Sequence, residues 1–366
     1  MIKTAGLIFL LTISIFGFAQ PQKSLSFYVG TFTSEGGTGI LYCNLNPETG
    51  EIKLVETFKG VDNPAFLSVS KDNRFLYTVA ESNDGYINAY EILENGALKF
   101  INKQFSNGAG PCFVNVSADG KWVAAANYGG GTVSLYPLSQ IGALLPATSV
   151  IVNQGSGADK VRQAVPRAHS VRFSPFSNAV FSADLGTDQL DIFTIEGGKL
   201  VQGEQRFVKM EPGAGPRHIE FHPSGKLIYV INELNSTITT VKSVNGKWER
   251  GASISTLPAG FDGKSYCADI HISANGKYLY GSNRGHNSIA VFEINDDKLK
   301  LKTTVQVEGN WPRNFALSPD GRFLLVANQR SGNITVFRID ENTGIPTFTG
   351  QELKMASPVC IEFLNL

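Results

Sequence analysis

The sequence predicts an all-β protein that forms a closed β-propeller of seven blades, each with four antiparallel strands. Three observations support this prediction. One strand–turn–strand pattern recurs six times, the copies are spaced like propeller blades, and the two ends of the chain carry the parts of a seventh copy. The composition agrees, because 38 Gly, 24 Phe and only 17% charged residues suit short strands and tight turns.

Each copy of the repeat has an apolar strand, a polar turn, a second strand, a short turn and a third strand. A fourth strand follows, for example at residues 97–105 and 298–307. The residue at the polar turn recurs at intervals of 47, 57, 48, 51 and 45 residues, which matches four-stranded blades. The longest interval contains an expected insertion at residues 139–165. The turn residues are Ser70, Ser117, Ser174, His222, Ser273 and Ser318.

The seventh blade is expected to combine both ends of the chain. The C-terminal stretch SPVCIEFLNL reads as a first strand with nothing after it, and residues 25–58 supply SFYVGTF, GILYCNL and IKLVETF as the missing three strands. Joining them closes the ring and removes the exposed strand edges of an open array. We therefore expect one propeller domain over residues 25–366.

Residues 1–19 have the pattern of a signal peptide. Lys3 gives the positive start, Leu7 to Phe18 form a short apolar run, and Gly17 and Ala19 are small residues at the cleavage positions. The apolar run is short for a membrane span. We expect an exported protein, periplasmic or secreted, with no membrane attachment after cleavage.

Composition and residue spacing exclude several classes of partner. The 32 basic and 32 acidic residues give no net charge, which argues against nucleic acid. The four cysteines are far apart, three of them in apolar strand patterns, so we expect buried free thiols. No Cys/His spacing resembles a zinc site, and nothing points to a cofactor, another metal or an obligate protein partner.

Charged residues recur at one position of the innermost strand. The residue after the opening Pro, or after its replacement, is ionisable in three of seven blades, with His169, Arg217 and Arg313 at that point. All three share strand parity with core residues, and a buried unpaired charge would be costly there. We therefore expect them to face a wet pocket or a charged partner.

A second set lies where the second strand ends. Glu233 and Arg284 occupy this position, and an Asn precedes it in four blades, including Asn127 and Asn328. Because the first two strands are antiparallel and innermost, the start of one lies beside the end of the other. His169, Arg217, Arg313, Glu233 and Arg284 should therefore meet at one mouth of the central channel, a natural concave site.

Structural roles are an alternative for several of these residues. The repeated Asn suits a turn former, and Arg217 with Glu233 could form a structural ion pair. His218 and His286 lie near the same mouth and could support the site from behind. We expect His271 to be structural and His222 to lie on the opposite rim.

Four segments resemble the propeller lactonase family, which includes bacterial 6-phosphogluconolactonases of the propeller type and fungal carboxy-muconate lactonizing enzymes. The resemblance runs from about Tyr28 to the C-terminus, and its specific blocks are PRH…NEL and SNRGHNSIAVF. The four segments are ANYGGGTVSLYPL, GPRHIEFHPSGKLIYVINELNSTITTV (which contains PRH…NEL), SNRGHNSIAVF and WPRNFALSPDGRFLLVANQRSGNITVF.

The resemblance implies a site made of His169, Arg217, Glu233 and Arg284. The family's H-A-H stretch reads Arg167-Ala168-His169 here, so its first His is absent, while the pair Arg162-Gln163 is retained. A family His before a G-S-G stretch is replaced by Asn153-Gln154.

This set of residues suits opening of a sugar lactone that is phosphorylated or carboxylated. His169 or Glu233 could act as general base, and Arg217 could stabilise the oxyanion. Arg284, Arg313, His218, Asn127 and Asn328 are the expected substrate-binding residues. Two alternatives stay open: a lactonizing isomerase using the same groups, and a non-catalytic periplasmic binding propeller.

Overall fold

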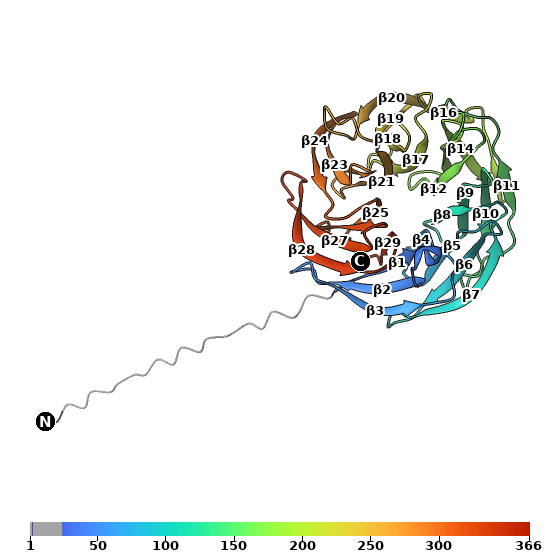
Figure 1. The fold of residues 1–366 in the computed structure, drawn as a ribbon. Helices are drawn as coiled ribbons and strands as arrows, with labels where there is room; N and C mark the ends of the chain where they lie inside the picture. The colour runs from blue at the N-terminus through green and yellow to red at the C-terminus, as the bar shows by residue number, and fades with distance from the viewer. Residues whose placement is uncertain (1, 3–23) are drawn as a thin grey trace.

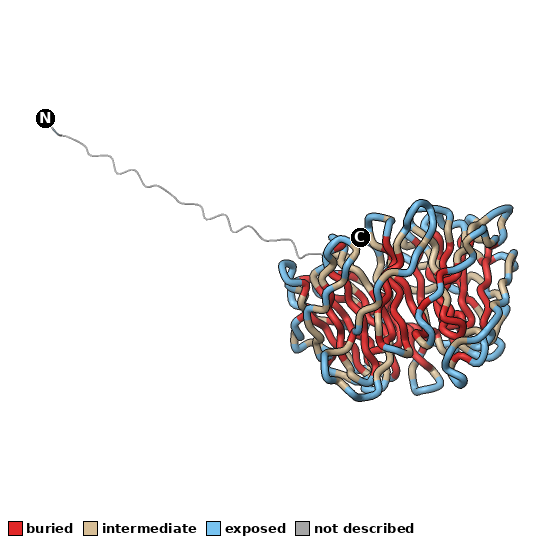
Figure 2. The backbone as a smooth tube through the Cα atoms, turned by 90° about the horizontal axis from the view of Figure 1, so that it is seen from above, coloured by how far each residue is buried: buried red, intermediate tan, exposed pale blue. Residues whose placement is uncertain are grey.

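The computed structural model describes Ile2 and residues 24–366, so the expected signal peptide lies outside the described residues apart from Ile2. Seven sheets surround a central channel, and the chain runs around the ring from blue to red in Figure 1. Figure 2 shows the disc from the side, with buried strands at mid-height and exposed turns on both rims. The predicted all-β seven-bladed propeller is confirmed.

The blades are antiparallel sheets in which the innermost strand lines the channel. Six blades have four strands, and one has five because β14 pairs with both β15 and β16 at its outer edge. A short 3-10 helix, η1 (Thr33–Glu35), follows β1. From inside to outside the blades are β29 (Pro358–Phe363), β1 (Leu25–Thr31), β2 (Ile40–Leu45), β3 (Ile52–Phe58); β4 (Leu67–Val69), β5 (Phe75–Ala80), β6 (Tyr86–Ile92), β7 (Leu98–Phe105); β8 (Pro111–Val116), β9 (Trp122–Asn127), β10 (Thr132–Pro137), β11 (Ser149–Val152); β12 (Ala168–Phe173), β13 (Ala179–Asp184), β14 (Gln189–Glu196), β15 (Lys199–Val201), β16 (Phe207–Lys209); β17 (Pro216–Phe221), β18 (Leu227–Asn232), β19 (Thr237–Val244), β20 (Lys247–Ser255); β21 (Tyr266–Ile272), β22 (Tyr278–Arg284), β23 (Ser288–Asn295), β24 (Lys298–Gln306); β25 (Pro312–Leu317), β26 (Phe323–Asn328), β27 (Asn333–Ile339), β28 (Pro346–Lys354).

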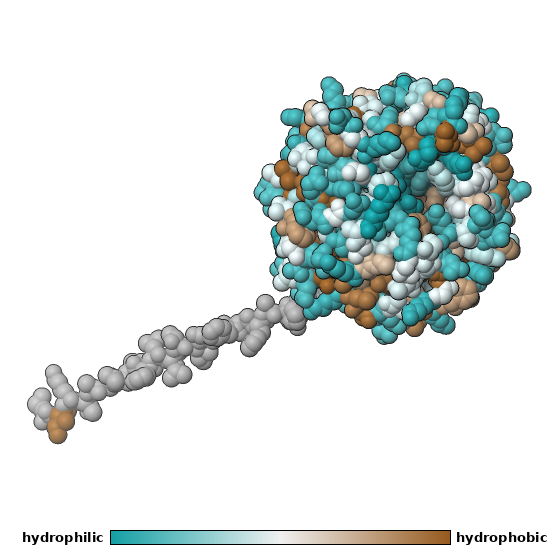
Figure 3. Space-filling view, viewed as in Figure 1, coloured by the Kyte–Doolittle hydropathy of each residue, from teal (hydrophilic) through white to brown (hydrophobic). Residues whose placement is uncertain are grey.

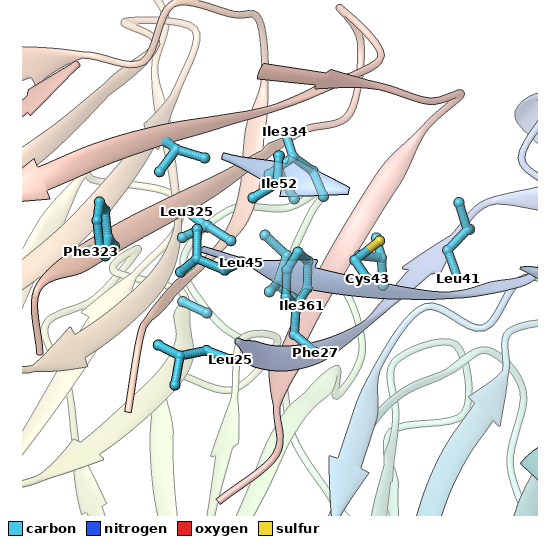
Figure 4. Packing of buried hydrophobic residues seen from close by; sticks show 14 residues of the cluster. Leu25, Phe27, Leu41, Cys43, Leu45, Ile52, Phe323, Leu325, Ile334 and Ile361 are labelled. Atoms are coloured by element: carbon cyan, nitrogen blue, oxygen red, sulfur yellow. The ribbon is translucent and has the colours of Figure 1, made fainter. Parts of the chain in front are cut away.

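The ring closes through its own two ends, as the sequence predicts. β29 pairs antiparallel with β1, with Val29 opposite Ile361 and Phe27 opposite Phe363. Side chains from both ends then pack against the sheet of β25–β28, where Phe27, Leu45 and Ile361 meet Phe323 and neighbouring residues (Figure 4). Similar apolar clusters fill the other junctions between blades, so packing between neighbours holds the ring.

A repeated β-bulge shapes the innermost strands. In four blades the pairing with the second strand skips one residue just after the opening position, so that Cys112, His169, Arg217 and Arg313 have no partner across the ladder. A bulge of this kind redirects side chains locally and is common beside functional sites. It turns the residues that follow the opening Pro toward the channel mouth, a change that simple strand alternation does not predict.

The expected insertion at residues 139–165 is partly a regular strand. β11 at Ser149–Val152 is the outermost strand of its blade and pairs with β10. The extra segment is therefore the loop that follows, from Asn153 to Val165, which runs back toward the channel. All four cysteines are buried and free, as expected.

Candidate functional site

The ionic residues from four parts of the chain meet around one carboxylate at a channel mouth. Glu233 follows β18, and its backbone N–H donates to Gly215 O at 2.7 Å. Its Oε2 lies 2.8 Å from Arg284 Nη2 and 3.2 Å from Arg217 Nε. Its Oε1 lies 2.5 Å from Arg162 Nη2. Three guanidiniums therefore surround one buried carboxylate.

Figure 3 shows one face of the disc, where hydrophilic residues gather around its hollowed centre.

The degree of exposure divides the arginines of the ionic cluster into two kinds. Arg217 and Arg284 side chains are only 3% and 7% exposed, whereas the Arg162 side chain is 37% exposed. The buried pair is thus part of the wall, and Arg162 covers the cluster from the solvent side.

Glu233 is held in its ionised form. Burial alone raises its pKa, but the charges of Arg284, Arg217 and Arg162 outweigh burial and lower the pKa to about 2. Glu233 is therefore an acceptor and an anchor for the arginines near neutral pH. With so low a pKa it is a weak proton acceptor.

His169 lies beside this carboxylate and, unlike it, is uncharged. Its Nε2 is 4.0 Å from Glu233 Oε2, and its Nδ1 is 3.8 Å from Cys112 Sγ. Burial lowers the His169 pKa well below the usual range, and the positive charge of Arg217 acts in the same direction. The imidazole is therefore neutral, and we assign its proton to Nδ1, facing the sulfur. Tyr128 packs against the ring edge at 5.3 Å between centroids.

Arg217 is held from behind by His218. His218 Nε2 lies 3.1 Å from Arg217 Nη1, which also donates to Ala268 O at 2.5 Å. His218 Nδ1 lies 2.7 Å from Asp269 Oδ1. Burial and then Arg217 lower the His218 pKa to about 3, so this ring is neutral, with Nδ1 donating to Asp269 and Nε2 accepting from Arg217. Both ring nitrogens contact protein groups, which supports the alternative that His218 holds the site from behind, and a direct contact with substrate stays a prediction.

Arg313 reaches the same mouth without joining the cluster on Glu233. Its Nη2 lies 3.9 Å from Glu81 Oε2, and its guanidinium lies over the Phe32 ring at 4.9 Å. The Arg313 charge nevertheless helps to lower the pKa values of His169 and Arg217. Arg313 and Glu81 therefore form a second, more open ion pair beside the buried cluster.

The two predicted asparagines lie inside their blades. Asn127 and Asn328 are fully buried, and their amide groups donate to nearby strand groups, Ser106 O at 2.9 Å and Thr335 Oγ1 at 3.1 Å. Neither contacts the cluster around Glu233. These bonds support the structural alternative, and a contact with substrate stays a prediction.

Arg162 and Asp269 are the two residues that sequence reasoning missed. The loop after β11 brings Arg162 to Glu233, and the loop is anchored by buried Gln163, whose Nε2 donates to Asp188 Oδ1 at 2.7 Å and Leu185 O at 2.8 Å. The retained Arg162-Gln163 pair was the available signal. No repeat position pointed to Asp269, because it lies one residue beyond the position of the innermost strand at which charged residues recur.

Neither a metal site nor a membrane helix is found in the described part of the chain. Within residues 24–366 no group of three His, Cys, Asp or Glu side chains is arranged to hold a metal ion. Over the same residues no helix is long and apolar enough to cross a bilayer.

The fold and the mouth together define a β-propeller with a buried ionic site at one end of its channel. The chain matches the family described as "Lactonase, 7-bladed beta-propeller" over residues 26–363. It belongs to this family.

Individual relatives cover nearly the whole chain. A 6-phosphogluconolactonase from Bacillus subtilis is 35% identical over 92% of this chain and 98% of its own length. One from Formosa agariphila is 38% identical over 89% of this chain and 96% of its own. The solved structure of a periplasmic gluconolactonase from Pseudomonas aeruginosa superposes with a TM-score of 0.88, at 29% identity, over 93% of this chain and 99% of that one.

Proposed function

We propose that this protein hydrolyses the ring ester of a sugar lactone that carries a negative charge. One observation carries the proposal: a neutral, buried imidazole lies 4.0 Å from a carboxylate that is held ionised by three arginines. Such a pair can hold one water molecule between a proton acceptor and a fixed anion. The names of the relatives at 35–38% identity agree with this chemistry.

The charge balance at the mouth supports an anionic substrate. Among the described residues, Arg162, Arg217, Arg284 and Arg313 have Glu233 and Glu81 as their acidic partners within ion-pair distance. The surplus is two positive charges. A phosphate or carboxylate on the sugar would restore the balance, and a guanidinium fork suits either group.

His169 is the proposed general base. A water bound to both His169 Nε2 and Glu233 Oε2 would attack the lactone carbonyl carbon, forming the new C–O bond while Nε2 takes its proton. Glu233 would orient this water and keep the arginines in place. His169 is the proposed base because its imidazole is neutral at neutral pH and can take up a proton.

Arg217 and Arg284 are the proposed donors to the oxyanion. Among the described residues no protein group accepts a hydrogen bond from Arg217 Nη2 or Arg284 Nη1, so both can donate to the carbonyl oxygen as it becomes negative. Collapse of this intermediate breaks the ring C–O bond, and the imidazolium returns its proton to the leaving oxygen. The product is the open hydroxy acid.

Export of the protein belongs to the same proposal. Residues 1–19 have the signal-peptide pattern, and a similar solved protein carries the name periplasmic gluconolactonase. Fractionation of cells that express the full chain, with mass determination of the mature N-terminus, tests this part.

A pH-stat assay of the purified protein tests the activity. Glucono-δ-lactone, its 6-phosphate and a muconolactone are compared at about pH 6.5, where spontaneous hydrolysis is slow, and ring closure is assayed on the corresponding acids. We expect acid release from a charged sugar lactone, strongly reduced in His169→Ala and retained in His286→Gln, a matched histidine change on the same rim. Equal rates in wild type and His169→Ala would refute the proposed base, and ring closure without hydrolysis would favour the isomerase.

A further inference from the structure

The opposite end of the channel contains a second polar cavity that the proposed reaction does not use. The cavity measures about 380 Å³. Among the residues that line it is the one four positions after the opening residue (Pro or its replacement) of each innermost strand, so all seven blades contribute one side chain. These residues are Ser68, Asn115, Arg172, Glu220, His271, Ala316 and Glu362.

A layer of rings separates this cavity from the ionic mouth. Phe66 stacks on Phe113 with 4.0 Å between centroids, and both lie in the cavity lining. The His218 ring meets both phenylalanines edge-on, at 5.7 and 5.1 Å. The two rings thus floor the cavity on one side and contact the residue behind Arg217 on the other. The lining of the cavity shares no residue with the cluster around Glu233, although Asp269 contacts both His271 in the cavity wall and His218 behind Arg217.

Three polar side chains of the ring each use one atom to join neighbouring blades. Ser68 Oγ accepts the Val116 N–H at 3.2 Å, and Asn115 Oδ1 accepts the Phe173 N–H at 3.1 Å. These bonds fix the side chains in place, because each is tied to the next blade. Glu362 Oε1 accepts the Val69 N–H at 3.1 Å in the same way.

Several polar atoms of the side chains that line the cavity have no protein partner within residues 24–366, and two of these side chains, Asn115 and Arg172, also border a neighbouring surface pocket. Among the described residues no protein group bonds to Glu362 Oε2, Asn115 Nδ2 or Arg172 Nη2, and none of the three atoms is sealed from solvent. Two donors and one acceptor are therefore fixed and unused around one small space. Burial raises the Glu362 pKa to about 7, so its free oxygen can accept or donate near neutral pH.

The charges in the wall argue against a simple ion as the occupant. Arg172 Nη1 lies 3.2 Å from Glu220 Oε2, and His271 Nδ1 lies 3.6 Å from the same oxygen. Both signs of charge are therefore present and largely paired. No metal-binding group occurs here among residues 24–366. A free anion would meet Glu220 and Glu362, and a free cation would meet Arg172 and His271.

We propose that this cavity, hereafter the far cavity, binds a neutral polyhydroxylated molecule the size of one monosaccharide. Hydroxyl groups both donate and accept, which matches the unused atoms of Glu362, Asn115 and Arg172. The C–H face of a sugar would lie on the apolar floor of Phe66 and Phe113. The volume lies within the range of ordinary small-molecule sites. The proposal does not depend on lactone hydrolysis at the other mouth.

Isothermal titration calorimetry and saturation-transfer NMR with D-glucose and D-glucitol test the proposal. Two variants address the far cavity: Glu362→Gln keeps an oxygen for the Val69 N–H but replaces the free acceptor by a donor, and Ala316→Leu fills space without removing a polar group. His169→Ala is the matched control, because it changes the ionic mouth only. Each protein is also titrated with glycine and with sodium phosphate.

We expect a polyol to bind wild type and His169→Ala equally, and to bind both far-cavity variants at least tenfold more weakly. If Ala316→Leu fails to fold, the polyol affinity of Glu362→Gln alone decides the test. The proposal is overturned if neither polyol binds, if binding is lost in His169→Ala but kept in Glu362→Gln, or if only glycine or phosphate binds. Loss of lactonase activity in His169→Ala bears on the other mouth alone, so the two hypotheses fail separately.

Discussion

Replacing Glu233 by Gln should destabilise the protein as well as impair its activity. The side chains of Arg217 and Arg284 are 3% and 7% exposed and both lie within 3.2 Å of Glu233 Oε2. Gln has almost the same shape as Glu but carries no charge. The variant would therefore leave two buried guanidiniums without their anion, with little change in packing.

The structure sets the size of this effect. Removing one partner of a buried ion pair typically costs about 3–5 kcal/mol, because the other charge stays desolvated. Residues 24–366 make a domain of 343 residues. Its entropy of unfolding should be roughly 0.7 kcal/mol per kelvin at the midpoint. The expected loss in Tm is then about 4–7 °C.

Differential scanning calorimetry measures this shift, with two comparison variants. Glu81→Gln is the matched control, because its partner Arg313 lies 3.9 Å away and both side chains are partly exposed, 29% and 17%. We expect that control to lose less than about 2 °C. The double variant Glu233→Gln with Arg284→Gln should recover part of the loss, since it removes one stranded cation.

Two results would refute this reasoning. One is a Tm for Glu233→Gln within 1 °C of wild type, which would mean that water or another group compensates the arginines. The other is a double variant that loses the sum of the two single effects, because independent contributions would exclude the coupling between Glu233 and Arg284.

Other predictions follow from the same structure. His169→Ala should lower kcat by a factor of about 10²–10⁴. Because the folded-state pKa of His169 lies well below 6.5, kcat/KM of the wild type should fall only as the pH drops below 6.5. A fall of kcat/KM that begins above pH 6.5 would contradict this. Arg162→Ala should raise KM with Tm unchanged, since its side chain is 37% exposed; a large Tm loss would show a structural role. Asp269→Asn should lower the pKa of His271 from about 10 toward 6.5, which NMR of the imidazole measures. The variant should also lose a contribution to folding stability that wild type has in full below pH 6.5 and loses as the pH rises through 10. An unchanged His271 pKa would show that Asp269 is not what raises it. Deleting residues 358–366 should abolish cooperative unfolding, because it removes β29 and reopens the ring; a sharp calorimetric transition in that variant would contradict the closure argument.

The fold could be read from the sequence because the blades repeat. Apolar alternation, turn residues and spacing recur in every copy, so an error in one blade is corrected by the others. The closure was predictable for a related reason. A lone first strand at the C-terminus and three strands at the N-terminus complete each other, and β29 pairs with β1 as expected.

The candidate site was partly predictable for the same reason. His169 and Arg217 share one repeat position, Glu233 and Arg284 share another, and antiparallel pairing brings both positions to one rim. Arg162 lies on a loop outside the repeat, so no register could place it.

By itself, the sequence determined the architecture and the rim on which its charged residues lie, because both depend on periodicity and on antiparallel pairing within each blade. The tertiary structure alone decided their contacts, their burial and their charge states. The bulge after each opening position frees His169 and Arg217 from the ladder, and packing across the channel puts His218 between Arg217 and Asp269. The charge state of Glu233 likewise depends on three arginines brought together from distant segments. Electrostatic energies depend on distances of a few ångströms and on burial, and residues far apart in the chain acquire both only when the ring is closed.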